Sequence, residues 1–88
     1  MNTQTEILQI VNLALMVNAL GGHQVVVNFG GESAHFCAFI YPKGSHAPVD
    51  YLHCFIDQPE SHLKLWVIRQ QMETLLENEE ARIKKVAA

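Results

Sequence analysis

Three stretches of this chain alternate in the manner of β-strands, and the last two are apolar or aromatic on both faces. In residues 24–29, apolar side chains alternate with a set that includes glutamine and asparagine. In residues 34–41 and 51–56, both alternating sets consist of apolar, aromatic, histidine or cysteine side chains. A sheet built from these strands has two faces that avoid water, and each face needs a cover. This requirement constrains the fold more than any other feature of the sequence.

The connections between these stretches predict an antiparallel sheet. Gly30-Gly31-Glu32-Ser33 is typical of a hairpin, because glycine accepts the positive φ angles of tight turns. Residues 42–48 include two prolines, a glycine and a serine, so we expect a loop there. The strands are therefore predicted at residues 24–29, 34–41 and 49–56.

A first helix is predicted over residues 3–20. Thr3 and Glu6 have the spacing of a capping box, in which each side chain satisfies the backbone amide of the other residue. Apolar residues then recur at helical spacing and spread around most of the circumference. We therefore expect other parts of the molecule to cover this helix on more than one side. Gly21 and Gly22 supply its stop.

A second helix is predicted to begin near Pro59, with Asp57 as its N-cap. Its apolar stripe gives way to charged residues from about residue 77. At ~1.5 Å per residue, a helix over residues 59–85 would be about 40 Å long, against about 25 Å for an eight-residue strand. Its last turns therefore overhang the sheet, and they either fray or lie against another chain. The apolar stripe consists of Leu65, Ile68, Met72, Leu75 and Leu76.

Together these elements predict a single α+β domain over residues 1–88, with a helix, a three-stranded antiparallel sheet and a second helix in the order αβββα. Two arrangements of the helices remain open. One helix on each face would make both faces core, whereas two helices on one face would leave the other face bare. We favour the bare face, because 49% of the residues are apolar, only 17% are charged, and a chain of 88 residues has a small core.

A bare face would serve as a contact surface for a second copy of the chain or for another protein. Trp66 on the second helix is either part of the core or an anchor in such an interface, and we expect core. The candidate interface residues are Phe39, Tyr41, Tyr51, His53 and Phe55, with Trp66 as an additional candidate.

The charge pattern and the N-terminal residues argue against several classes of function. The net charge is −3 and the six Lys and Arg residues form no stripe, so we expect no nucleic-acid partner. The longest apolar stretch, residues 7–20, contains polar residues and falls short of the ~20 residues of a membrane span, so we expect no membrane partner. Residues 1–6 lack the features of a secretory signal, so we expect a cytoplasmic protein with two reduced cysteines.

Histidine and cysteine are the main candidates for chemistry. His35, Cys37 and His53 could converge on neighbouring strands as metal ligands or as a Cys–His nucleophile pair. Structural zinc sites usually show paired short spacings such as Cys-x-x-Cys, and this sequence has neither these nor a phosphate-binding loop. Symmetric strand pairing about the 42–48 loop would place Cys37 opposite Cys54, whereas a shift of one residue would put them on opposite faces. We therefore expect no cofactor, no metal and no catalytic residues.

Three short motifs occur in order along the chain. Residues 27–31 read apolar-Asn-aromatic-Gly-Gly, residues 39–42 end a strand in Tyr-Pro, and residues 56–60 read Ile-Asp-Gln-Pro-Glu before the last helix. In this order they resemble small uncharacterised proteins encoded by bacteriophages and prophages, which implies a phage origin and no particular activity. The element order is also that of double-stranded RNA-binding domains, but those carry lysines where this chain has Pro59-Glu60-Ser61-His62.

From these features we expect a non-enzymatic protein–protein interaction module that forms a homodimer and acts as a phage accessory factor binding a bacterial host protein. The alternative is a small metal- or ligand-binding domain, or an enzyme, that uses His35, Cys37 and His53.

Overall fold

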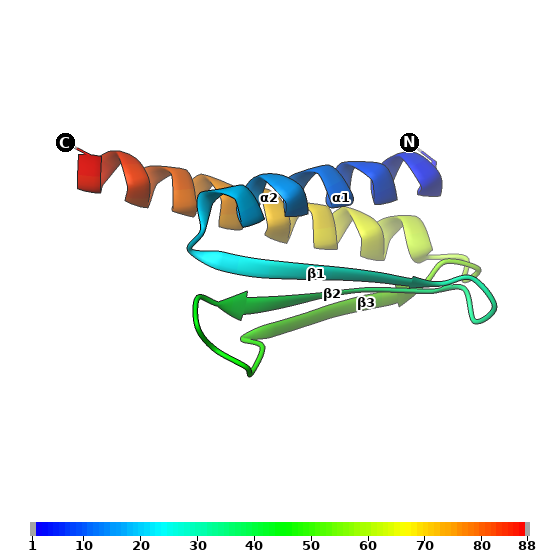
Figure 1. Ribbon diagram of the computed structural model, residues 1–88. Coiled ribbons are helices and arrows are strands. Elements are labelled where there is room, and N and C mark those ends of the chain that lie inside the picture. The colour runs from blue at the N-terminus through cyan, green and yellow to red at the C-terminus, as the bar shows by residue number, and fades with distance from the viewer. Residues whose placement is uncertain (1, 88) are drawn as a thin grey trace.

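The computed structural model describes residues 2–87 and shows a layer of two helices on a three-stranded sheet (Figure 1). Its elements are α1 (Thr3–Leu20), β1 (His23–Gly30), β2 (His35–Pro42), β3 (Asp50–Phe55) and α2 (Ser61–Ala87). The sheet order is β1-β2-β3, and both neighbouring pairs are antiparallel. The predicted αβββα fold is therefore confirmed.

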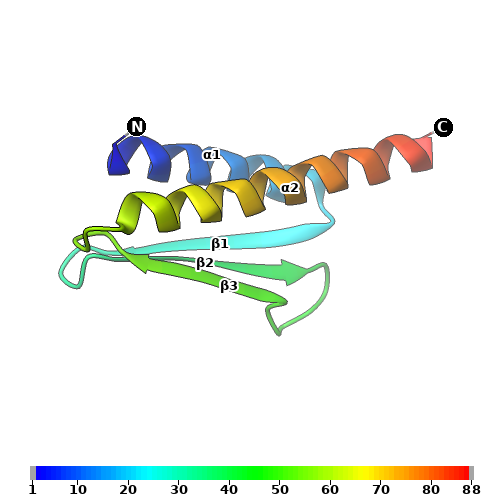
Figure 2. The same cartoon turned by 180° about the vertical axis from the view of Figure 1, so that it is seen from behind.

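Both helices lie on the same face of the sheet, above it in Figure 1 and again in the reverse view of Figure 2. Helix α1 packs over β1, α2 packs over β3, and the helices pack against each other. None of the elements within residues 2–87 covers the opposite face of the sheet. The one-sided arrangement that we favoured from the sequence is the one that the structure adopts.

The core lies between the helix layer and the covered face of the sheet. The register pairs Val25 with Ile40 and Phe36 with Cys54, so alternate residues of each strand meet the helices. Phe36 is completely buried there. The helices contribute the buried residues Ile10, Ala14, Val17, Leu65, Ile68, Met72 and Leu76.

The start of α1 differs from the predicted capping box. The cap is Asn2, whose Oδ1 accepts a hydrogen bond from the Thr5 amide at 2.8 Å, so Thr3 lies inside the helix. Glu6 is only 4% exposed and accepts a hydrogen bond from Arg69 Nε of α2 at 2.7 Å. The sequence motif was misread because a buried ion pair between the helices uses the Glu6 carboxylate. This hydrogen bond is also the main reason that the pKa of Arg69 is raised.

Helix α2 begins at Ser61, two residues later than Pro59, and Asp57 does not cap it. The Gln58 amide donates a hydrogen bond to the Phe55 carbonyl at 3.3 Å. The Ser61 amide donates one to the Gln58 carbonyl at 3.1 Å. These successive turns carry the chain from the sheet to the helix layer, and the helix can begin only after them.

Helix α1 is covered on two sides, by β1 and by α2, as expected, and its outer side is exposed. Leu8 is 61% exposed, Leu15 is 64% exposed and Met16 is 44% exposed. Both helices lie in a single layer, so the surface of α1 that points away from the sheet meets no other element of residues 2–87.

The C-terminal turns of α2 extend beyond the sheet and beyond α1, as the red end of the ribbon in Figure 1 shows. The molecule measures 46 × 29 × 16 Å along its principal axes. Its radius of gyration is 13.6 Å, against about 12 Å for a compact domain of this length. The overhang predicted from the helix length is therefore present, as continuous helix.

A polar contact joins this long helix to the start of the sheet. Glu79 is 5% exposed, accepts a hydrogen bond from Arg82 Nε at 3.1 Å and has Oε1 at 3.1 Å from His23 Nδ1. Gly22 lies against the same carboxylate, and a Cβ at this position would overlap Glu79 Oε1. A side chain at this position would therefore displace the Glu79 carboxylate.

Candidate interaction surface

The face of the sheet that points away from the helices carries one continuous set of side chains, which we call the bare face. The register pairs Val26 with Phe39 and Phe39 with Tyr51, so these side chains form a row across the three strands. Tyr51 and Phe55 are each 43% exposed. The bare face comprises Gln24, Val26, Asn28, His35, Cys37, Phe39, Tyr41, Tyr51, His53 and Phe55.

Aromatic and imidazole rings on the bare face stack on one another. Phe39 stacks on Tyr51 with ring centroids 4.6 Å apart, and Tyr51 stacks on His53 at 4.9 Å. His35 meets Phe55 at 4.8 Å. These contacts hold the rings in place. The face carries no Lys, Arg, Asp or Glu.

The structure therefore brings together five of the six candidate interface residues predicted from the sequence. Phe39, Tyr41, Tyr51, His53 and Phe55 share the bare face.

Trp66 lies on α2, in the other layer of the molecule, and is 50% exposed. The expectation that it belongs to the core is wrong. Its position on the helix is off the buried stripe through Leu65 and Ile68, and residues next to such a stripe face solvent unless a further element covers them.

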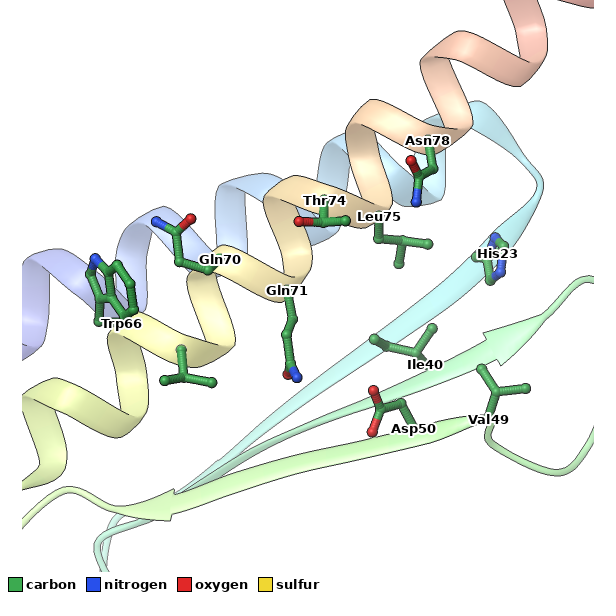
Figure 3. A pocket seen from close by; sticks show the side chains of 11 residues that line it. His23, Ile40, Val49, Asp50, Trp66, Gln70, Gln71, Thr74, Leu75 and Asn78 are labelled. Atoms are coloured by element: carbon green, nitrogen blue, oxygen red, sulfur yellow. The ribbon is translucent and has the colours of Figure 1, made fainter.

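Trp66 instead contributes to a cavity of about 540 Å³ along the outer side of α2 (Figure 3). The helix side of this cavity combines apolar side chains with amide and hydroxyl groups. The sheet side is His23, Ile40, Val49 and Asp50. Its lining residues do not pair a nucleophile with a base. Sequence analysis missed this cavity and also the exposure of Leu63 and Val67, because the apolar stripe alone does not show which neighbouring positions stay uncovered.

His35 and His53 meet on the bare face, with His35 Nε2 at 3.3 Å from His53 Nδ1. One ring donates to the other in a direction set by the tautomers. Cys37 is the cross-strand partner of His53. Nevertheless, within residues 2–87 no group of three His, Cys, Asp or Glu side chains is placed to hold a metal ion. The predicted convergence is real for the two histidines, and it stops short of a metal site with three ligands.

The two cysteines lie on opposite faces of the sheet, so symmetric pairing about the loop was wrong by one residue. Cys37 pairs with His53, and Cys54 pairs with Phe36. Both thiols are free. Burial raises the pKa of Cys54 above its ordinary value, with a smaller opposing effect of Lys64. A reactive thiolate needs the opposite shift, so Cys54 is unsuited to nucleophilic chemistry.

Comparisons with models of known families, with curated proteins and with solved structures find no significant match to this chain. In the described part of the chain, neither helix has both the length and the apolar character to cross a membrane.

Proposed function

We propose that this chain is a protein–protein interaction module that works as a homodimer, with the bare face as part of its contact surface. The observation that carries the proposal is the placement of both helices on one face of a sheet whose other face is a stacked aromatic surface. Exposed aromatic patches of this kind are typical of protein interfaces.

The exposed surface of the single chain supports this proposal. Its accessible area is 5653 Å², against about 5,200 Å² for a typical monomer of this length. The overhanging end of α2 contributes to this larger accessible area. The rings of Tyr51 and Phe55 contribute to its apolar part. A partner that covers the β3 side of the bare face would remove apolar area from water.

A second copy of the chain suits this surface because the bare face is uncharged. The protein has a net charge of −3, so acidic groups within a self-contacting surface would repel their own copies. No ionised carboxylate, ammonium or guanidinium group lies on the bare face. Tyr and His side chains on it combine an apolar ring with a polar tip, which suits a surface that is wet in the monomer and partly covered in the dimer.

The proposed role as a phage accessory factor that binds a bacterial host protein rests on the sequence resemblance alone. A pull-down from bacterial lysate with the wild-type protein and with Tyr51→Lys tests it, because specific capture of a host protein should require the bare face.

The alternative use of His35, Cys37 and His53 as a metal or catalytic site has one supporting contact, the 3.3 Å approach of the two imidazoles. Two ligands are fewer than the three or four of ordinary zinc sites. We therefore give priority to the interaction surface.

Sedimentation velocity at micromolar concentration tests the homodimer. We expect a dimer for the wild-type chain and a weaker dimer for Tyr51→Lys, because the substitution replaces a half-exposed aromatic ring of the bare face with a charged side chain. Asn12→Lys is the matched control. Asn12 is an exposed residue of α1, so this substitution adds the same charge to the helix layer. A wild-type chain that stays monomeric at these concentrations would overturn the proposal.

A further inference from the structure

The two edges of the sheet differ in how their backbone groups are satisfied. On the β1 edge, the Asn18 side chain of α1 accepts a hydrogen bond from the Val25 amide at 2.7 Å and donates one to the Val25 carbonyl at 2.9 Å. The amide side chain thus occupies the place that a neighbouring strand would take. This contact closes part of the β1 edge.

In the described part of the chain, the β3 edge has no equivalent two-bond cover. The Ile56 amide donates a hydrogen bond at 2.7 Å to the carbonyl of Ala34, the residue just before β2. Backbone groups alternate in direction along a strand, so Cys54 and Leu52 also point toward β2. The backbone groups of Tyr51, His53 and Phe55 therefore point outward. At the start of the strand, the Tyr51 amide donates a hydrogen bond to the side chain of its own neighbour, Asp50, at 3.0 Å.

Apart from Asp50 at its start, this strand also lacks the features that usually protect an exposed edge. Natural edge strands carry lysines, prolines, bulges or inward charges that block pairing with another chain. Residues 51–55 read Tyr-Leu-His-Cys-Phe and contain none of these. A groove of about 300 Å³ runs beside them under α2, lined by Tyr51, Leu52, His53, Lys64, Val67, Ile68 and Gln71. The groove shows that α2 does not completely close this side of β3.

We propose that two copies of the chain join by antiparallel pairing of their β3 strands, centred on His53. This inference rests on the proposed homodimer and specifies where the copies meet. The outward-pointing residues are placed symmetrically about His53, so His53 would face His53 of the second copy and Tyr51 would face its Phe55. Each such pair exchanges two backbone hydrogen bonds. The strand is therefore complementary to itself, and the pairing needs no other sequence.

The pairing would extend the sheet across both copies, with the two bare faces on the same side. Tyr51 and Phe55 of opposite copies would become cross-strand aromatic neighbours. The joined face would be twice as wide as that of one chain, and the half-exposed rings of β3 would move from its rim to its centre.

His53→Pro tests this arrangement, because proline removes the outward amide of His53 and leaves the β2–β3 ladder intact. Each dimer then loses two central hydrogen bonds, and we expect dimerisation to weaken roughly 10- to 100-fold in sedimentation equilibrium. Phe29→Pro is the matched control, since Phe29 shares the outward direction of Val25 on the β1 edge and is 59% exposed. It should leave dimerisation unchanged.

Amide hydrogen exchange of the wild-type protein supplies a readout that needs no variant. The amides of Tyr51, His53 and Phe55 should be protected at concentrations where the dimer forms and exchange freely where the monomer dominates. Free exchange of these amides in the dimer would overturn the inference, whether or not His53→Pro folds.

Phe39→Lys separates the edge arrangement from face-to-face packing of two bare faces. Phe39 lies on the central strand, away from the β3 edge. The edge arrangement predicts that Phe39→Lys still dimerises. Loss of the dimer in Phe39→Lys, together with its survival in His53→Pro, would overturn the inference and keep the proposed function. A monomeric wild-type chain would overturn both.

Discussion

The two faces of this sheet are built from the same three strands and have different surroundings. Phe36 and Ala38 on the covered face are completely buried under the helices. Phe39 on the bare face directly follows Ala38 in the sequence, and its ring stacks on those of Tyr41 and Tyr51. The covered face is mainly aliphatic or small, whereas the bare face is rich in Tyr, His and Phe. Apolar character alone therefore does not distinguish the covered face from the bare face, whereas the polar groups of Tyr and His do.

The difference in side chains between the two faces also explains why the sheet needs no second helix layer. Tyr and His keep a hydroxyl or a ring nitrogen in water while their rings stack, so the bare face is tolerated in the single chain. A face of Leu and Ile at the same positions would be a far greater aggregation hazard.

Phe36→Ala and Phe39→Ala form a matched pair on the two faces of β2, and we expect the largest difference between them. Phe36→Ala leaves a cavity in the core and should lower the free energy of unfolding by about 3–5 kcal/mol. Phe39→Ala removes ring contacts on a surface and should cost about 1 kcal/mol in the monomer. Urea unfolding at low protein concentration measures both values.

Equal losses for these two variants would break the comparison, because they would mean that the bare face is as well packed as the core. The slope of unfolding free energy against urea should be the same in both variants, since neither changes the surface exposed on unfolding by much.

Element types and order followed from the sequence because strand alternation, paired glycines and helical spacing are local signals. Details that depend on tertiary contacts did not follow. Glu6 was assigned to a cap because its pairing with Arg69, sixty-three positions away, leaves no local trace. The Cys37–His53 register differs by one residue from symmetric pairing, and loop length alone does not determine it. Trp66 was placed in the core because propensity does not show which side of a helix is uncovered.

The covered side of the sheet should also have an acid-sensitive contact at Glu79. Hydrogen bonds from Arg82 and, second, from His23 hold the pKa of Glu79 below its ordinary value of 4.5. A carboxyl with a lowered folded-state pKa stabilises the fold above its unfolded pKa, and this stability is lost as pH falls through the folded pKa. Thermal unfolding between pH 6 and pH 3 should therefore show a steeper acid loss in the wild type than in Glu79→Gln.

His23→Gln is the control for this acid effect, because it removes the second contribution and keeps the hydrogen bonds from Arg82. Its acid loss should lie between those of the wild type and Glu79→Gln. Identical pH profiles for all three proteins would show that the Glu79 contact contributes nothing to acid sensitivity.

The smallest expected effect concerns the two thiols, one on each face. Cys37 is 6% exposed and Cys54 is 1% exposed, and burial raises the pKa of Cys54. Iodoacetamide should therefore modify Cys37 before Cys54, because alkylation requires that the reagent reach the sulfur and that the thiol be ionised. Mass mapping at pH 8 follows the two reactions. Earlier modification of Cys54 would reverse the assignment of the two faces.

The rate at which Cys37 is alkylated also depends on how two copies meet. Face-to-face packing would protect Cys37 as protein concentration rises, whereas pairing at the β3 edge would leave its alkylation rate nearly constant, since Cys37 lies on the central strand.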